Sequence, residues 1–154
     1  MDDVAAGEVV EYLTAHNLGT IAVTDGLNPG AHSVYYVNKG LRIYFESNPQ
    51  SQKIHILGSN PRVSMTVDED YGDWRKIKGV QLFGKATVAD QRRAPKLHGI
   101  FESKFPHLHD LGGLPDHHVF VEVIPEKIYF MDFSKGFGHK EVYYPDNLKS
   151  LIKW

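Results

Sequence analysis

The stretch from residue 41 to residue 68 reads LRIYFESNPQSQKIHILGSNPRVSMTVD, and it holds the local pattern around which the chain is built. Residues 41–46 alternate apolar and mixed side chains, as a half-buried strand does, and an Asn-Pro pair then signals a turn. Ser51 is placed to cap a short helix that runs to Leu57. A Gly-Ser-Asn-Pro sequence ends this helix, and residues 62–68 alternate again. The stretch therefore predicts a strand, a turn, a short helix and a second strand.

The start of the predicted helix suits a phosphate group. The first N–H groups of a helix lack partners within it, and its dipole attracts an anion. Gln52 and Lys53 would lie in this first turn beside Ser51, and Lys53 adds a positive charge. The alternative is an ordinary connecting helix with a solvated lysine. There is no Walker loop and no GxGxxG after a strand, so the two strong nucleotide fingerprints do not decide between these hypotheses.

Composition limits the class of protein. A length of 154 residues predicts one domain over residues 1–154 with a substantial core, and a net charge of −2 does not favour nucleic acid as a partner. The chain has no cysteine, which excludes disulfides, thiol chemistry and cysteine-bound zinc. The first residues do not resemble a signal peptide, and no stretch is apolar for long enough to span a bilayer. We therefore expect a soluble cytoplasmic protein with no membrane partner.

The rest of the chain predicts short strands with helices attached. Gly84, in the middle of an alternating segment, indicates a bulge or a close approach of another backbone or of a ligand. The fold class expected is mainly β with helices (α+β), as an antiparallel barrel. The predicted helices span residues 4–17, 51–57 and 95–105, with a short one over 146–154. The predicted strands span 20–25, 32–37, 41–46, 62–68, 80–88, 119–124 and 127–133, the last two joined by a turn at Pro125-Glu126, with a glycine-rich loop over 134–139.

Several motifs follow one another in an order that resembles the pyridoxamine 5'-phosphate oxidase-like family, the FMN-binding split barrels. Ser51-Gln52-Lys53 is similar to the family's Ser-Arg-Lys triplet, and Asn60-Pro61-Arg62-Val63 to the start of its next strand. The segment from Val80 to Ala86 matches a V-x-x-x-G-x-A strand. The ending from Pro125 to His139 resembles that of an uncharacterised branch of the family. The resemblance covers residues 18–144 and implies a split-barrel fold.

The resemblance also implies FMN as cofactor and a homodimer with the flavin at its interface. It places the FMN phosphate at Ser51, Gln52 and Lys53, with Asn48 near the ribityl or phosphate oxygens. The preceding strand would lie along the isoalloxazine ring. The partner subunit would contribute through Trp74 or through the loop 137–140. The implied cofactor-binding residues are His32, Ser33, Val34, Tyr35, Asn48, Ser51, Gln52, Lys53, Trp74 and Lys78.

Departures from the family pattern limit what the resemblance implies. The Arg-x-His-x-Arg substrate signature of true pyridoxamine 5'-phosphate oxidases reads Phe137, His139 and Glu141 here, without either arginine. Without those cations to bind a substrate phosphate, we do not expect that activity. Gln52 replaces an arginine in the phosphate triplet, and Gly79, beside Lys78, replaces a glutamine.

The sequence leaves the chemistry of the site open. No residue stands out as a general acid or base, and His139 is the best of the weak catalytic candidates. The histidines at 107, 109, 117 and 118 have no helical metal-binding motif, so we predict no metal site. We expect a flavoprotein that acts as an FMN-dependent oxidoreductase on an unidentified substrate. A non-catalytic flavin-binding protein for storage or sensing and a haem-binding split barrel are the alternatives.

Overall fold

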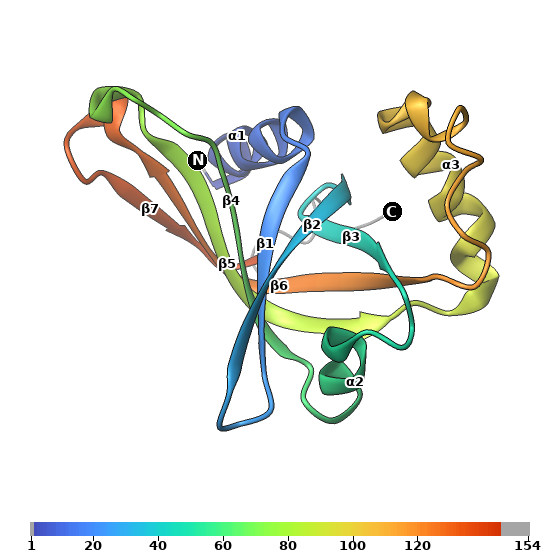
Figure 1. Cartoon of the computed structure of the whole chain (residues 1–154). Helices are drawn as coiled ribbons and strands as arrows, with labels where there is room; N and C mark the ends of the chain where they lie inside the picture. Colours follow the sequence, from blue (N-terminus) through green and yellow to red (C-terminus); the bar gives the residue numbers. More distant parts are fainter. Residues whose placement is uncertain (1, 146–154) are drawn as a thin grey trace.

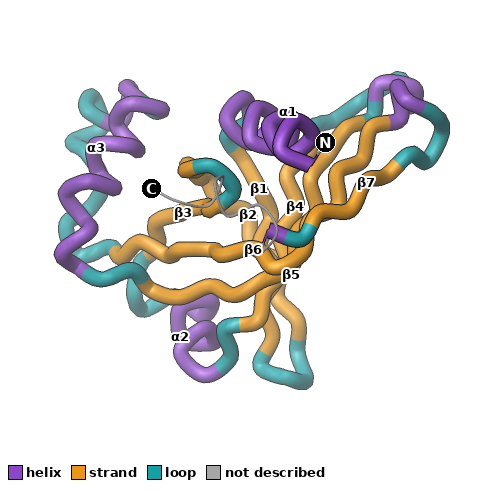
Figure 2. The backbone as a smooth tube through the Cα atoms, turned by 180° about the vertical axis from the view of Figure 1, so that it is seen from behind, coloured by secondary structure: helices purple, strands orange, loops and turns teal. Residues whose placement is uncertain are grey.

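A computed structural model describes residues 2–145, with only the backbone described for residues 2–5. Its strands form one antiparallel sheet in the order β3-β2-β1-β4-β5-β6-β7, and a further pairing of β3 with β6 closes the first six into a barrel. Figures 1 and 2 show α1 over one end of the barrel, α2 at the other end and α3 to one side. The elements are α1 (Asp2–Ala15), β1 (Leu18–Thr24), β2 (Pro29–Lys39), β3 (Arg42–Ser47), α2 (Gln52–Ser59), β4 (Arg62–Asp68), β5 (Lys78–Val88), α3 (Ala94–Lys104), β6 (Val119–Asp132) and β7 (Lys140–Tyr143), with short 3₁₀ turns η1 (Trp74–Lys76), η2 (Gln91–Arg93), η3 (Pro106–Leu108) and η4 (Phe133–Lys135).

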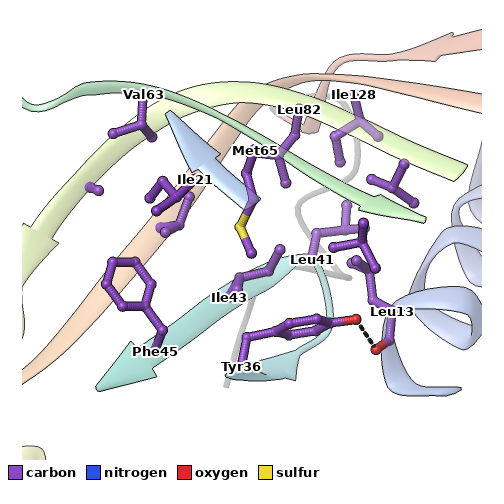
Figure 3. Packing of buried hydrophobic residues seen from close by; sticks show 14 of the residues in the cluster. Leu13, Ile21, Tyr36, Leu41, Ile43, Phe45, Val63, Met65, Leu82 and Ile128 are labelled. Carbon is purple, nitrogen blue, oxygen red and sulfur yellow. Dashed lines mark hydrogen bonds between the residues drawn. The ribbon is translucent and has the colours of Figure 1, made fainter. Parts of the chain in front are cut away.

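The main core fills the barrel. Every second residue of β4 points inward, so that Val63, Met65 and Val67 are buried as the alternation predicted. Figure 3 shows Met65 among side chains from the neighbouring strands, with Leu13 of α1 closing one end. The Tyr36 hydroxyl donates to the Leu13 carbonyl oxygen over 2.6 Å, which gives a buried polar atom its partner. Each large apolar side chain in this core stabilises the fold by about 1.5–3 kcal/mol.

A second, smaller core attaches α3 to the outside of the barrel. Val37, Tyr44 and Phe120 face outward from β2, β3 and β6, and they pack against Leu97 and Phe101 of α3. The helix predicted over residues 95–105 is confirmed, and the apolar Leu97, Phe101 and Phe105 of this segment are buried. One segment of the barrel wall is therefore apolar on both faces.

The final strands differ from the prediction. Residues 119–132 form one continuous strand, β6, so the turn predicted at Pro125-Glu126 is wrong. The register with β5 shifts by one residue beside Gly84, which pairs with Pro125. A Cβ added at Gly84 would lie 2.1 Å from the Ile124 carbonyl oxygen. The close approach predicted for Gly84 is confirmed, and this bulge accommodates a proline that would otherwise interrupt a central strand.

Three smaller differences concern the ends of the chain and of β5. The strand β7 was not predicted, because it has only four residues and begins with Lys140 and Glu141. The alternation in residues 80–88 predicts Val88 on the same face as the buried Leu82 and Ala86, but at the end of β5 it is 45% exposed. The helix predicted for residues 146–154 lies outside the described part of the chain.

Among the helices of residues 2–145, none has the length and apolar character that a membrane crossing requires.

Candidate functional site

The start of α2 lies directly after β3, in a turn held by local hydrogen bonds. The Asn48 side-chain oxygen accepts from the Gln50 backbone N–H over 3.0 Å, and the Asn48 carbonyl oxygen accepts from the Ser51 N–H over 3.0 Å. These bonds bring Ser51 back beside Ser47, the buried last residue of β3. The turn therefore orients the first turn of α2 relative to the barrel.

The first turn of α2 has no side-chain cap. Ser51 occupies the N-cap position, as predicted, but its hydroxyl makes no capping hydrogen bond. It lies instead 3.0 Å from the Ser47 hydroxyl. The first turn also contains no acidic residue that would compensate the helix dipole. The N–H groups at this helix start are therefore available to an anionic ligand.

Lys53 supplies the positive charge at this helix start. Its side chain is half-buried, whereas Gln52 is exposed. Lys53 forms no ion pair with another side chain of residues 6–145. The ammonium group and the uncapped N–H groups therefore lie in the same turn, without an internal carboxylate to neutralise them.

The four predicted residues of β2 do not all face the same side. Val34 is buried in the barrel core, so only its backbone could meet a ligand outside the barrel. Ser33 and Tyr35 alternate with it and are exposed, Tyr35 by 64%. The His32 Nε2 atom is buried without a hydrogen-bond partner among the described residues. Ser33 and Tyr35 are therefore the side chains of this strand that an outside ligand would contact.

The other predicted site residues lie at a different end of the barrel. Trp74, in η1, stacks on Phe137 with ring centroids 6.1 Å apart, and both rings are largely exposed. Lys78 begins β5 and pairs with Asp132 of β6, beside this aromatic pair. In Figure 1 the turn between β4 and β5 lies far from α2. Within one chain, Trp74 and Lys78 therefore lie apart from the start of α2.

His139 belongs to a small polar cluster at that same end. Its Nε2 atom lies 3.2 Å from a Glu141 carboxylate oxygen, and the other oxygen of Glu141 accepts from the Tyr143 hydroxyl over 2.6 Å. The hydrogen bond from Tyr143, followed by that from His139, lowers the pKa of Glu141. The imidazole is therefore already paired with a carboxylate within the chain.

A buried charge network joins α3 to the barrel, and the sequence analysis did not identify it. Glu122 of β6 is 7% exposed and accepts from the Tyr44 hydroxyl over 2.7 Å and from Arg93 over 2.8 Å, with Arg42 at 3.7 Å. Burial alone would raise the pKa of Glu122, but the hydrogen bonds from Arg93 and Tyr44 and the nearby cations outweigh it and lower the pKa. Burial, together with the bond to Glu122, raises the pKa of Tyr44 to about 12. In the sequence, this network is indicated by Glu122, a charged residue within the apolar run VFVEVIP.

A pocket of about 370 Å³ between β2–β3 and the α3–η3 segment was also not predicted from the sequence. Phe101 and Phe105 were predicted as helix core, but nothing in the sequence placed Tyr35 and Glu46 opposite them. Because these residues come from segments far apart in the chain, only the barrel closure reveals the pocket. It is lined by Asn17, Tyr35, Glu46, Phe101, Phe105, His107, Leu108 and Leu114.

The clustered histidines do not form a metal-binding group. Among the described side chains of residues 6–145, no three or more histidine, aspartate or glutamate side chains are arranged to hold a metal ion. His118 Nδ1 instead contacts the Glu46 carboxylate, and the His117 ring lies edge-on to that of His118. His107 is exposed at the rim of the pocket described above.

Comparison with known proteins connects this geometry to a family. The sequence profile described as pyridoxamine 5'-phosphate oxidase matches residues 5–132. A UPF0306 protein of Pasteurella multocida is 25% identical over 101 residues, which are 64% of this chain and 68% of that protein.

Solved structures with the same fold include proteins that bind different groups. A FAD-binding protein of Mesorhizobium loti is 25% identical, with a TM-score of 0.66 over 80% of this chain and 91% of its own. A heme-binding protein of Mycobacterium smegmatis is 15% identical, with a TM-score of 0.75 over 94% of this chain and 60% of its own. At that identity the second likeness concerns the fold alone.

Proposed function

The chain belongs to the pyridoxamine 5'-phosphate oxidase family, and from this premise we propose that it binds FMN and acts as an FMN-dependent oxidoreductase. The observation that carries the proposal is the start of α2, where N–H groups without a side-chain cap and Lys53 lie together in a turn that has no acidic residue. That arrangement fits the dianionic phosphate that distinguishes FMN from riboflavin. When bound, FMN would supply the hydride chemistry.

Different residues around α2 would contact different parts of FMN. Ser51 and Ser47 present two hydroxyl groups 3.0 Å apart beside the helix start, where one can donate to a phosphate oxygen. Lys53 would carry most of the side-chain charge on the phosphate, because Gln52 offers only a neutral amide. Ser33 and Tyr35, exposed on β2, would contact the part of the cofactor that extends away from the helix.

Pyridoxamine 5'-phosphate does not fit as the substrate. The family's two signature arginines correspond to Phe137 and Glu141 here, and Phe137 is 80% exposed while Glu141 is paired with His139 and Tyr143. This end of the barrel thus presents a carboxylate and an aromatic ring where a phosphorylated substrate would require cations.

Lys53→Ala tests the phosphate site. We expect FMN affinity to fall by about 1.5–3 kcal/mol, the range for a hydrogen bond to a charged group, which is roughly ten- to hundredfold in Kd. Riboflavin has no phosphate, so its affinity should hardly change. Titration of the apoprotein with both flavins measures the two effects, and Lys85→Ala, an exposed lysine of β5, is the matched control. Equal losses for FMN and riboflavin would place Lys53 away from the phosphate.

The visible spectrum of the purified protein separates the other candidate functions. Flavin absorption bands support an FMN protein, whereas a Soret band would favour the haem-binding alternative suggested by the Mycobacterium smegmatis neighbour. Reduction of the bound flavin by a nicotinamide cofactor would then distinguish an oxidoreductase from a protein that stores or senses FMN.

We also propose that the protein is a homodimer, since Trp74 and Lys78 can join the α2 site only from a second copy. Apolar side chains support an interface on the outer face of β5, β6 and β7, where Phe83 and Val142 are 38% and 42% exposed and Phe83 meets the Tyr129 ring edge-on. Sedimentation at micromolar concentration is expected to give about twice the chain mass of 17.4 kDa. A monomer under these conditions would contradict a site shared between subunits.

A further inference from the structure

We infer that the pocket between β2–β3 and the α3–η3 segment binds a small aromatic molecule that carries a hydrogen-bond-donating or cationic group. Its volume of about 370 Å³ lies in the range of small-molecule sites. Phe101, Phe105, Leu108 and Leu114 form its apolar wall. Such a wall favours a flat apolar ring over a polar or branched solute.

Aromatic side chains at the pocket present ring edges and faces to a ligand. Tyr35 and Phe105 meet edge-to-face, with centroids 6.1 Å apart and planes at 83°. Tyr35 is 64% exposed, so most of its ring is accessible to a ligand. A planar ligand in the pocket would cover part of this ring and stack beside Phe105.

The polar end of the pocket determines the charge of the ligand. Glu46 contacts His118 through Oε2, and its other carboxylate oxygen has no hydrogen bond within residues 6–145, whose side chains the structure describes. Asn17 and His107 are the remaining polar residues of the lining. An acceptor oxygen at the end of an apolar pocket selects for a donor, and most strongly for an ammonium group.

The pocket adjoins the proposed phosphate site. Glu46 precedes Ser47, whose hydroxyl meets that of Ser51, and Tyr35 is one of the outward-facing residues of β2. We therefore assign the pocket to the molecule that reacts with the flavin. This assignment rests on the proposed function, whereas binding to the pocket does not.

The experiment compares three probes that share one ring system and differ in charge. Indole is neutral, tryptamine is cationic and indole-3-acetate is anionic at pH 7. Titration of the FMN-free protein, followed by NMR or calorimetry, is expected to give the tightest binding for tryptamine and the weakest for indole-3-acetate. Glu46→Gln should weaken tryptamine about three- to tenfold, because glutamine keeps an acceptor oxygen but removes the charge that strengthens the hydrogen bond, and it should leave indole unchanged.

Two substitutions to tryptophan test whether tryptamine binds in this pocket. Leu114→Trp fills the pocket and is expected to weaken tryptamine at least about tenfold, because the ligand must displace the new ring. Leu111→Trp adds the same side chain to the same loop, but Leu111 is 73% exposed and does not line the pocket, so this control should bind like wild type.

The outcomes distinguish this inference from the proposed function. Equal binding by both tryptophan variants, or tightest binding of indole-3-acetate, would overturn the pocket assignment even if FMN binds. Tryptamine binding that only Leu114→Trp weakens would support the pocket, even in a protein that failed to bind FMN.

Discussion

Gly84→Ala is expected to lower the free energy of unfolding by about 3 kcal/mol or more, a large fraction of the stability of an ordinary domain. The added Cβ would lie 2.1 Å from the Ile124 carbonyl oxygen and 2.9 Å from the Pro125 Cα. Both are backbone atoms of β6, so a change of side-chain conformation cannot relieve the contact. Urea denaturation of the two proteins measures the loss.

Gly99→Ala is the matched control for this substitution. Gly99 lies inside α3, and a Cβ there would meet no atom within 4 Å. Alanine should therefore raise the free energy of unfolding by about 0.5–1 kcal/mol through helix propensity. If Gly84→Ala remained within about 1 kcal/mol of wild type, the bulge would be able to widen and the tight packing of β5 on β6 would not be required.

Glu122→Ala should lower the free energy of unfolding by about 2–4 kcal/mol, because it leaves the buried Tyr44 hydroxyl and the partly buried Arg93 and Arg42 without their shared acceptor. Glu126→Ala is the control on the same strand: its ion pair with Arg62 is exposed, and its loss should cost at most about 1 kcal/mol. Denaturation at pH 7 compares the two. Similar losses would show that the network around Glu122 contributes no more than a surface pair.

The lowered pKa of Glu122 makes the same network sensitive to acid. A carboxyl group with a lower pKa in the folded state stabilises the protein above its unfolded pKa, and this stabilisation is lost as the pH falls through the folded value. Unfolding measured from pH 7 down to pH 3 should therefore show wild type losing more stability than Glu122→Gln, which has no proton to gain at this position. If wild type and Glu122→Gln lost stability in parallel as the pH falls, the charge of Glu122 would not be the source of the acid sensitivity.

Local sequence patterns predicted much of the barrel. The alternation in residues 62–68 identified β4 with its exact bounds, and the Ser51 segment identified α2 and its N-cap position. These features depend on residues near one another in the chain, where the spacing of apolar side chains and the helix signals are sufficient. The hydrogen-bond partner of the Ser51 hydroxyl could not be predicted in the same way, because its contact with Ser47 depends on how the turn folds back.

The sequence by itself determined the secondary structure around residues 41–68, the close approach at Gly84 and the family to which the chain belongs. Only the tertiary structure decided that β6 continues through Pro125, that Glu122 meets Tyr44 and Arg93, and that Tyr35 and Glu46 line a pocket with Phe105. It also separated Trp74 and Lys78 from the start of α2 within one chain. The physical reason is that side-chain periodicity specifies which residues share a face of one element. Contacts between distant segments depend on strand pairing, and here they follow from the register in which β3 and β6 close the barrel.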